Sequence, residues 1–235
     1  MSGRQPRLSG LITAEHASRR VPARWRGLFA EQPAVLSSHR AWDPGTDMLA
    51  RALSDSLQAP LLRGRVTRLL VDLNRSRGHP AQFSEFSRRL ERREQQALME
   101  CYWLPHWQAY ADALTSLPGR IVHLACHSFA PIMDGRERPV DIGLLYDPAR
   151  DRERRWCELL ASCLNKHLPN CRVRRNQPYR GTANGLGQQH RKWLDDNRLL
   201  TVELELRSDW ALRRDIRAAV LAACVEAFPG AATID

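Results

Sequence analysis

Short, almost entirely apolar runs alternate with longer amphipathic segments along this chain. The runs that predict buried strands are Leu8–Ala14, Arg68–Leu73, Arg120–Cys126, Asp141–Tyr146, Cys171–Arg175 and Leu199–Leu206. Helical periodicity is found over Met48–Leu57, Pro80–Leu117 with a break near Pro105, Asp151–His167 and Asp209–Phe228. Because strands joined through helices pair in parallel by right-handed crossovers, the pattern predicts an α/β fold with a central, mostly parallel sheet covered by helices.

The chain shows no repeat and no internal linker, so we expect one domain over residues 1–235 with its core at about 10–228. No segment approaches the roughly 18 consecutive apolar residues that a membrane-spanning helix requires. The charged segment Met1–Arg7 is not followed by the apolar stretch of a secretory signal. The six cysteines include no CxxC pair, and we expect most of them to be reduced and buried. These features predict a cytoplasmic protein.

The formal net charge of +10 raises the question of a nucleic-acid partner, because clustered basic residues bind phosphates. Nearly all of these charges are arginines, however, and they are spread along the whole chain. The densest group, Arg88–Glu94, mixes arginines with acids at helical spacing, which favours a solvated helix face over a polyanion site. We therefore do not expect nucleic acid to be the partner.

Polar side chains come directly after the predicted strands or near the end of the last one. They are Glu15 and His16, Asn74 and Arg75, His127 and Ser128, and, in the last strand, Glu203 and Glu205. Because ligands of open α/β sheets bind beyond the carboxyl ends of the strands, we expect these groups to meet at one edge. Two imidazoles and a carboxylate, with a fourth position left for water, form a catalytic zinc site. The spacing itself leaves this interpretation and buried, structurally satisfied histidines both open, since no local metal motif such as HExxH is present.

Several strings, in order along the chain, resemble the N-formylglutamate amidohydrolase family. They are Thr13–Pro22, His39–Gly45, Val71–Arg75, His127–Pro131 with Asp141–Tyr146, Asn176–Gly181 and Glu205–Asp209. The match extends from about residue 10 to about residue 225. The resemblance implies a distant relation to the zinc carboxypeptidases and the aspartoacylase group, hence an α/β fold with a mixed central sheet and a metal-activated water.

The resemblance also implies roles for individual residues. His16 and His127 resemble the two histidine ligands of a zinc or other divalent metal ion. Asn74 and Arg75 resemble the pair that holds the substrate carboxylate in the carboxypeptidase relatives, a task that suits the planar arginine fork. Glu205 resembles the general base that takes a proton from the activated water and passes it to the leaving amine.

The third metal ligand departs from the carboxypeptidase pattern. In those relatives a carboxylate follows the first histidine by three residues, whereas this chain has Arg19 at that position. Asp43 is our first candidate for the ligand and Glu15 our second. Either carboxylate could instead orient a histidine from behind.

Further residues of the matching strings are expected around the site. Tyr179 and Arg207 are candidates for substrate binding, and the Tyr179 hydroxyl could donate to a developing oxyanion. Glu15, His39, Ser128 and Asp141 are expected to support the ligands or to contact the substrate.

Each assignment has a structural alternative. His16 could merely pack at a strand end, and Arg75 could pair only with Asp72 or Asp141. Glu203 and Glu205 share one face of their strand, so one could be catalytic and the other only salt-bridged. The loop around Tyr179 could be purely structural.

The sequence thus predicts a metal-dependent amidohydrolase that cleaves the amide bond of a small, carboxylate-bearing N-acyl amino acid. The resemblance implies N-formylglutamate as the substrate. One alternative is a hydrolase of another N-acyl or peptide-like substrate. The other is a non-catalytic binding protein on the same fold, which the basic residue at position 19 leaves open.

Overall fold

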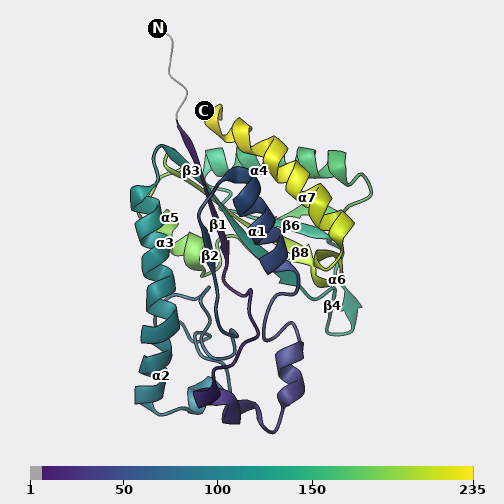
Figure 1. The fold of residues 1–235 in the computed structure, drawn as a ribbon. Helices are drawn as coiled ribbons and strands as arrows, with labels where there is room; N and C mark the ends of the chain where they lie inside the picture. The colour runs from purple at the N-terminus through teal and green to yellow at the C-terminus, as the bar shows by residue number, and fades with distance from the viewer. Residues whose placement is uncertain (1–6, 235) are drawn as a thin grey trace.

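A six-stranded mixed sheet forms the centre of the part of the chain that the structure describes, residues 7–234 of a computed structural model (Figure 1). The predicted domain ends and most of the segment Met1–Arg7 lie outside this range. The strands of the sheet are β1 (Leu8–Ala14), β2 (Leu61–Arg63), β3 (Arg120–Phe129), β6 (Ile142–Leu145), β7 (Val173–Arg175) and β8 (Leu199–Arg207). Their order is β2-β1-β3-β8-β6-β7, and every neighbouring pair is parallel except β6 with β8. The predicted fold class is confirmed.

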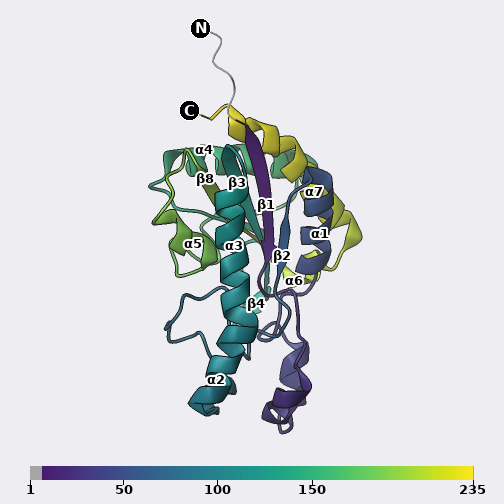
Figure 2. The ribbon, with the colours of Figure 1, turned by 60° about the vertical axis from the view of Figure 1, so that its left-hand side comes forward.

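Helices cover both faces of the sheet (Figures 1 and 2). One face packs against α1 (Thr46–Leu57), α4 (Asp151–His167) and α7 (Arg214–Ala227), whose apolar side chains form the main core with the strands. The other face lies under α3 (Leu104–Ser116) and α5 (Leu186–Arg191). His127 and Glu205 are lateral neighbours in the β3–β8 pair, as are His123 and Thr201 four residues earlier on the same strands. Because side chains alternate along a strand, all four lie on this second face.

Irregular structure extends beyond the carboxyl ends of β1 and β2, in the lower part of Figure 1. We call residues 17–45 and 64–91 the edge lobe. It has its own apolar cluster, which includes Trp25, Phe29, Leu70 and Phe86 together with Leu98 from α2 (Arg92–Leu98). The 3₁₀ helix Ala23–Phe29 contributes Trp25 and Phe29 to this cluster, and the 3₁₀ helix Pro33–Ser37 contributes Val35.

The predicted strand Arg68–Leu73 is wrong. These residues form turns in the edge lobe, and the side chains of Leu69, Leu70, Val71 and Leu73 are buried in its apolar cluster. The strand that pairs with β1 is instead Leu61–Arg63. An apolar run indicates burial, but burial in a second cluster of irregular backbone gives the same pattern as burial in a sheet.

The segment predicted as helical from Pro80 to Leu117 is a continuous helix only from Arg92 onward. Helix α2 continues through one π-helical turn, Met99–Trp103, into α3. Pro105 does not interrupt the helix. It lies in the first turn of α3, where a proline is tolerated because the N–H that it lacks would have no partner at that position. The predicted break therefore corresponds only to the irregular turn before it.

The remaining elements lie close to their predicted places. Helix α4 and strand β1 have the predicted bounds, whereas β3 runs to Phe129 and so contains His127. The C-terminal helix is divided into α6 (Ser208–Ala211) and α7. A hairpin of β4 (Ile132–Met133) and β5 (Arg136–Glu137) precedes β6. Among the described residues, no helix is long and apolar enough to span a membrane.

Candidate active site

A cavity of about 250 Å³ opens at the carboxyl edge of the sheet, between β3, β8 and the edge lobe. Most residues predicted for the site line it, namely His16, His39, Asp43, Asn74, Arg75, His127, Ser128, Tyr179 and Glu205. The cavity also contains residues that the sequence analysis did not assign to the site, among them Arg68, Arg180 and Asn184. Its walls are therefore predominantly polar and charged.

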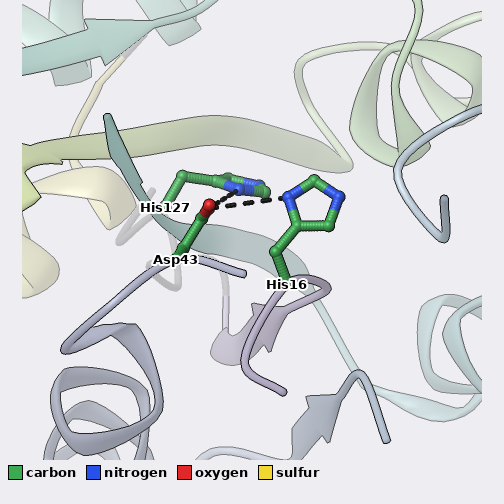
Figure 3. Close-up of side chains that lie close together, drawn as sticks. All are labelled: His16, Asp43 and His127. Atoms are coloured by element: carbon green, nitrogen blue, oxygen red, sulfur yellow. Dashed lines mark hydrogen bonds and ion pairs between the residues drawn. The ribbon is translucent and has the colours of Figure 1, made fainter. Parts of the chain in front are cut away.

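His16, Asp43 and His127 converge at one point of this cavity (Figure 3). Nδ1 of His127 lies 3.0 Å from Oδ2 of Asp43, and Nδ1 of His16 lies 3.5 Å from the same oxygen. The three ligand atoms are within 4.8 Å of one another, and all three residues are buried. Of the two candidates for the third metal ligand, Asp43 and Glu15, Asp43 is the one that faces both histidines, in each case at Nδ1.

Two further carboxylates stand behind the histidines. Nε2 of His16 lies 2.7 Å from Oδ1 of Asp72, and Nε2 of His127 lies 3.1 Å from Oε2 of Glu15. Because a carboxylate only accepts hydrogen bonds, Nε2 of His16 must donate to Asp72, and the lone pair of a neutral His16 ring is then at Nδ1. In both histidines Nδ1 is the nitrogen that faces Asp43.

The backbone positions Asp43 at the turn before α1. Its N–H donates to the carbonyl of His16 at 2.9 Å, and Oδ2 accepts the N–H of Ser128 at 3.2 Å. Its other oxygen is paired with the guanidinium of Arg68. The turn requires Gly45, which has a φ of +83° and whose added Cβ would lie 2.2 Å from the Ala211 carbonyl oxygen.

Burial and neighbouring charges shift the pKa values of His16 and His127 in opposite directions. Burial, reinforced by Arg68, lowers the pKa of His16 to about 4, despite the opposing effect of Asp72. Burial also acts to lower the pKa of His127, but the hydrogen bond and charge of Glu15 outweigh it and raise the value to about 9. In the metal-free protein His127 is therefore the protonated imidazole, held between the Glu15 and Asp43 carboxylates.

Glu205 projects from β8 beside His127, with which it is in register. Its side chain is buried, and one carboxylate oxygen has no hydrogen-bond partner among the described residues. Burial raises the pKa of this carboxyl to about 7, although the charge of His127 opposes the shift. A carboxyl that titrates near neutral pH can both accept and return a proton in one reaction cycle.

Asn74 and Arg75 line the cavity but are partly engaged in shaping it. Nη1 of Arg75 donates to the carbonyl oxygens of Asn74 and Asn184, at 2.8 and 2.7 Å. Oδ1 of Asn74 accepts the N–H of Leu186 at 2.7 Å. These bonds tie the edge lobe to the loop before α5. No ion pair links Arg75 to Asp72 or Asp141 in the described part of the chain.

Tyr179 and His39 lie at the outer end of the cavity and are exposed. Nη1 of Arg138 donates to the Tyr179 hydroxyl at 3.0 Å, and the same guanidinium lies over the rings of Tyr179 and Phe129. The hydroxyl accepts in this bond, so its own proton stays available for a substrate.

Arg207 and Asp141 do not line the cavity, contrary to our expectation of contacts in or next to the site. Arg207 pairs with Glu137, Asp141 and Asp209. Asp141 accepts two hydrogen bonds from the side chain of Arg172, at 2.7 and 2.9 Å. Both residues thus belong to an ion-pair network that joins β5, β6 and β8.

Arg68, Asp72 and His106 are the main residues near the site that the sequence analysis left without a role there. The first two are in the edge lobe segment mistaken for a strand. His106 is buried on α3, with Nε2 3.9 Å from Oε1 of Glu15 on the side away from His127. Charged residues at the edge of and within an apolar run were the available signal for Arg68 and Asp72, whereas nothing local distinguishes His106.

The residues at the convergence point suit a divalent metal ion. Nδ1 of His16 is buried, has no hydrogen-bond partner in the described chain, and faces Oδ2 of Asp43. Two imidazoles and one carboxylate are the protein ligands of many catalytic zinc sites. The open side of the group faces the cavity, where a substrate would enter.

The chain is similar to a known protein family and to solved structures. Residues 8–211 match the sequence profile described as N-formylglutamate amidohydrolase. The crystal structure of gene product Atu2144 from Agrobacterium tumefaciens is 28% identical, with a TM-score of 0.78, over 96% of this chain and 90% of that one. An N-formylglutamate amidohydrolase from Ralstonia eutropha JMP134 shares the fold at 17% identity and a TM-score of 0.62, over 99% and 95% of the two chains. No curated protein matches this chain significantly.

The profile match spans most of the chain and includes every residue of the cavity. It supports hydrolysis of an amide bond as the reaction class. On this evidence the chain belongs to the N-formylglutamate amidohydrolase family.

Proposed function

We propose that this protein is a metal-dependent amidohydrolase that cleaves the amide bond of a small, carboxylate-bearing N-acyl amino acid. The observation that carries the proposal is the convergence of His16, Asp43 and His127 in a cavity that also contains the buried Glu205. N-formylglutamate is the substrate that family membership suggests. Zinc is the metal that the two imidazoles and one carboxylate favour.

The three ligands would hold the metal, and Asp72 and Glu15 would keep both imidazoles in the required tautomer. A divalent ion bound there supplies Lewis acidity, which polarises the amide carbonyl and acidifies a water molecule. Glu205, which is in register with His127 on the neighbouring strand, would take a proton from that water and deliver it to the departing amine nitrogen. Its pKa of about 7 suits both transfers.

The arginines of the cavity would hold the substrate carboxylate. Arg75 keeps its position through Nη1, which leaves its other nitrogens for a ligand. Arg180 lines the same cavity from the loop before α5. Tyr179 would donate its hydroxyl proton to the oxygen that develops negative charge.

The first experiment is elemental analysis of untagged protein, for the wild type and the variants His127→Ala and Asp43→Asn. We expect close to one zinc per chain in the wild type and little in either variant. Formate release from N-formylglutamate and from other N-formyl amino acids would then be measured on the zinc-loaded enzyme. A wild-type protein that is metal-free and takes up no zinc on titration contradicts the proposal.

A further inference from the structure

Glu203 is an acid of the cavity for which the proposed reaction has no use. It lies on β8 two residues before Glu205, on the same face, and lines the cavity half-buried. Over residues 7–234, its carboxylate takes part in no hydrogen bond or ion pair. The sequence alternative in which Glu205 is catalytic and Glu203 only salt-bridged is therefore not what the described residues show.

The immediate neighbours of Glu203 in the cavity wall carry no positive charge. Its lateral neighbour on β3 is Ala125, whose small side chain takes little space. The loop above it passes at Gly185, where an added Cβ would stand 3.0 Å from Oε1 of Glu203 and 2.9 Å from Oδ1 of Asn74. The loop backbone thus lies against one side of this carboxylate, and neither Ala125 nor Gly185 supplies a positive charge to it.

The charges around Glu203 are unevenly matched. Arg68 is paired with Asp43, and Nη1 of Arg75 is bonded to two carbonyl oxygens. Arg180 lines the cavity without an acid at ion-pair distance in the part of the chain that the structure describes. Among the described residues, the cavity therefore offers an incoming ligand the carboxylates of Glu203 and Glu205 and the guanidinium groups of Arg75 and Arg180, none of which forms an ion pair with a side chain of opposite charge.

A partly buried carboxylate without a partner is unfavourable, and a ligand ammonium or guanidinium group removes that cost by a charge-assisted hydrogen bond. We propose that Glu203 binds a cationic nitrogen of the substrate, so that the preferred substrate is an N-acyl amino acid carrying both a carboxylate and a positive charge. Nα-acyl derivatives of diamino acids such as lysine have this chemistry. The inference rests on the proposed function and narrows its substrate class, since the second carboxylate of N-formylglutamate would face repulsion at Glu203.

The first test compares Nα-formyl-lysine with Nα-formyl-norleucine, which has the same chain without the ammonium group, and with N-formylglutamate. We expect kcat/KM of the wild type to be about ten- to hundredfold higher for the lysine compound than for the norleucine compound. Glu203→Gln should abolish this preference, and Glu203→Asp should keep part of it. Glu31→Gln, at an exposed position of the edge lobe, is the matched control.

The second test measures binding without hydrolysis, by calorimetry of Nα-methylsulfonyl-lysine and Nα-methylsulfonyl-norleucine, which have no acyl amide to cleave, with wild type and Glu203→Gln. Tighter binding of the lysine compound that is lost in the variant supports the inference even if no N-formyl compound is cleaved, in which case only the proposed function fails. Equal binding of the two compounds, or a lysine preference that survives in Glu203→Gln, overturns it.

Discussion

The two faces of the central sheet are built for different purposes. Along β3 and β8, the face under α1, α4 and α7 carries Val122, Leu124, Cys126, Leu200, Val202 and Leu204, all fully buried. The opposite face carries His123, His127, Thr201, Glu203 and Glu205 on the same two strands. Alternation along a strand thus separates packing from chemistry by a single residue.

The polar face is stabilised by specific side-chain hydrogen bonds rather than by close apolar packing. His123 contacts Thr13 at 2.9 Å, Tyr110 at 2.8 Å and Thr201 at 2.6 Å, so the polar column continues below the cavity. Burying such groups costs free energy unless each finds its partner. The apolar face tolerates changes of shape at a cost in stability, whereas changes on the polar face should alter the chemistry.

The largest expected effect is on the polar face, at Glu205. Replacing Glu205 by Gln removes the proton acceptor but keeps the size of the side chain, so kcat should fall by about 10²- to 10⁴-fold. Zinc content and thermal stability should stay near the wild-type values. Retained kcat in this variant would move the role of base to another residue.

The opposite outcome is expected one residue away, at Leu204. Leu204→Ala opens a cavity in the fully buried core and should lower the free energy of unfolding by about 2–5 kcal/mol. Urea denaturation measures this loss. At a temperature where the variant is folded, its zinc content should equal that of the wild type, and loss of the metal would show that the two faces are coupled.

Asp72 tests whether the polar face depends on the edge lobe. Asp72→Asn can no longer act as a charged acceptor for Nε2 of His16, so zinc affinity should drop by about 10- to 100-fold. Competition with a chromophoric chelator gives this affinity. The comparison variant is Asp55→Asn, an exposed residue of α1, and an equal loss in both would contradict the orienting role of Asp72.

The smallest effect is expected at Asp141, which the structure places outside the cavity. Its hydrogen bonds from Arg172 hold the pKa of the Asp141 carboxyl below its ordinary value, although burial opposes the shift. A carboxyl with a lowered pKa stabilises the fold above the pKa of the unfolded chain, near 3.9, and this contribution disappears as the pH falls through the folded value. Asp141→Asn should therefore lower stability at pH 7 by about 1–2 kcal/mol. The difference in stability between variant and wild type should vanish in acid, and the KM of the variant should equal that of the wild type. A raised KM would show that Asp141 contributes to the substrate site.

The sheet and the convergence of the two histidines were predictable from the sequence because the ends of parallel strands meet at one edge. His16 follows β1 and His127 lies near the end of β3, and both runs are plainly apolar. The partners of these histidines were harder to foresee. Asp72 is in a run of irregular backbone whose apolar pattern mimics a strand, and its contact with His16 spans 56 residues.

Arg207 shows a second limit of sequence reasoning. It shares the strand parity of Glu205 and a matching family string, and both features point to the cavity. The decisive factor is lateral, since Asp141 enters the sheet beside the end of β8 and forms an ion pair with Arg207. Lateral neighbours of this kind depend on strand order, which periodicity does not reveal.

The reversed direction of β6 has a consequence for engineering. Because β6 runs antiparallel to β8, the connection from β3, which includes the β4–β5 hairpin, begins and ends at the cavity edge of the sheet. Arg138, at the end of this hairpin, already contacts Tyr179 and Phe129 of the cavity. A loop anchored in this way can be lengthened, shortened or exchanged without shifting the register of any strand. The hairpin is thus a natural position for libraries that aim to redirect the enzyme toward new substrates.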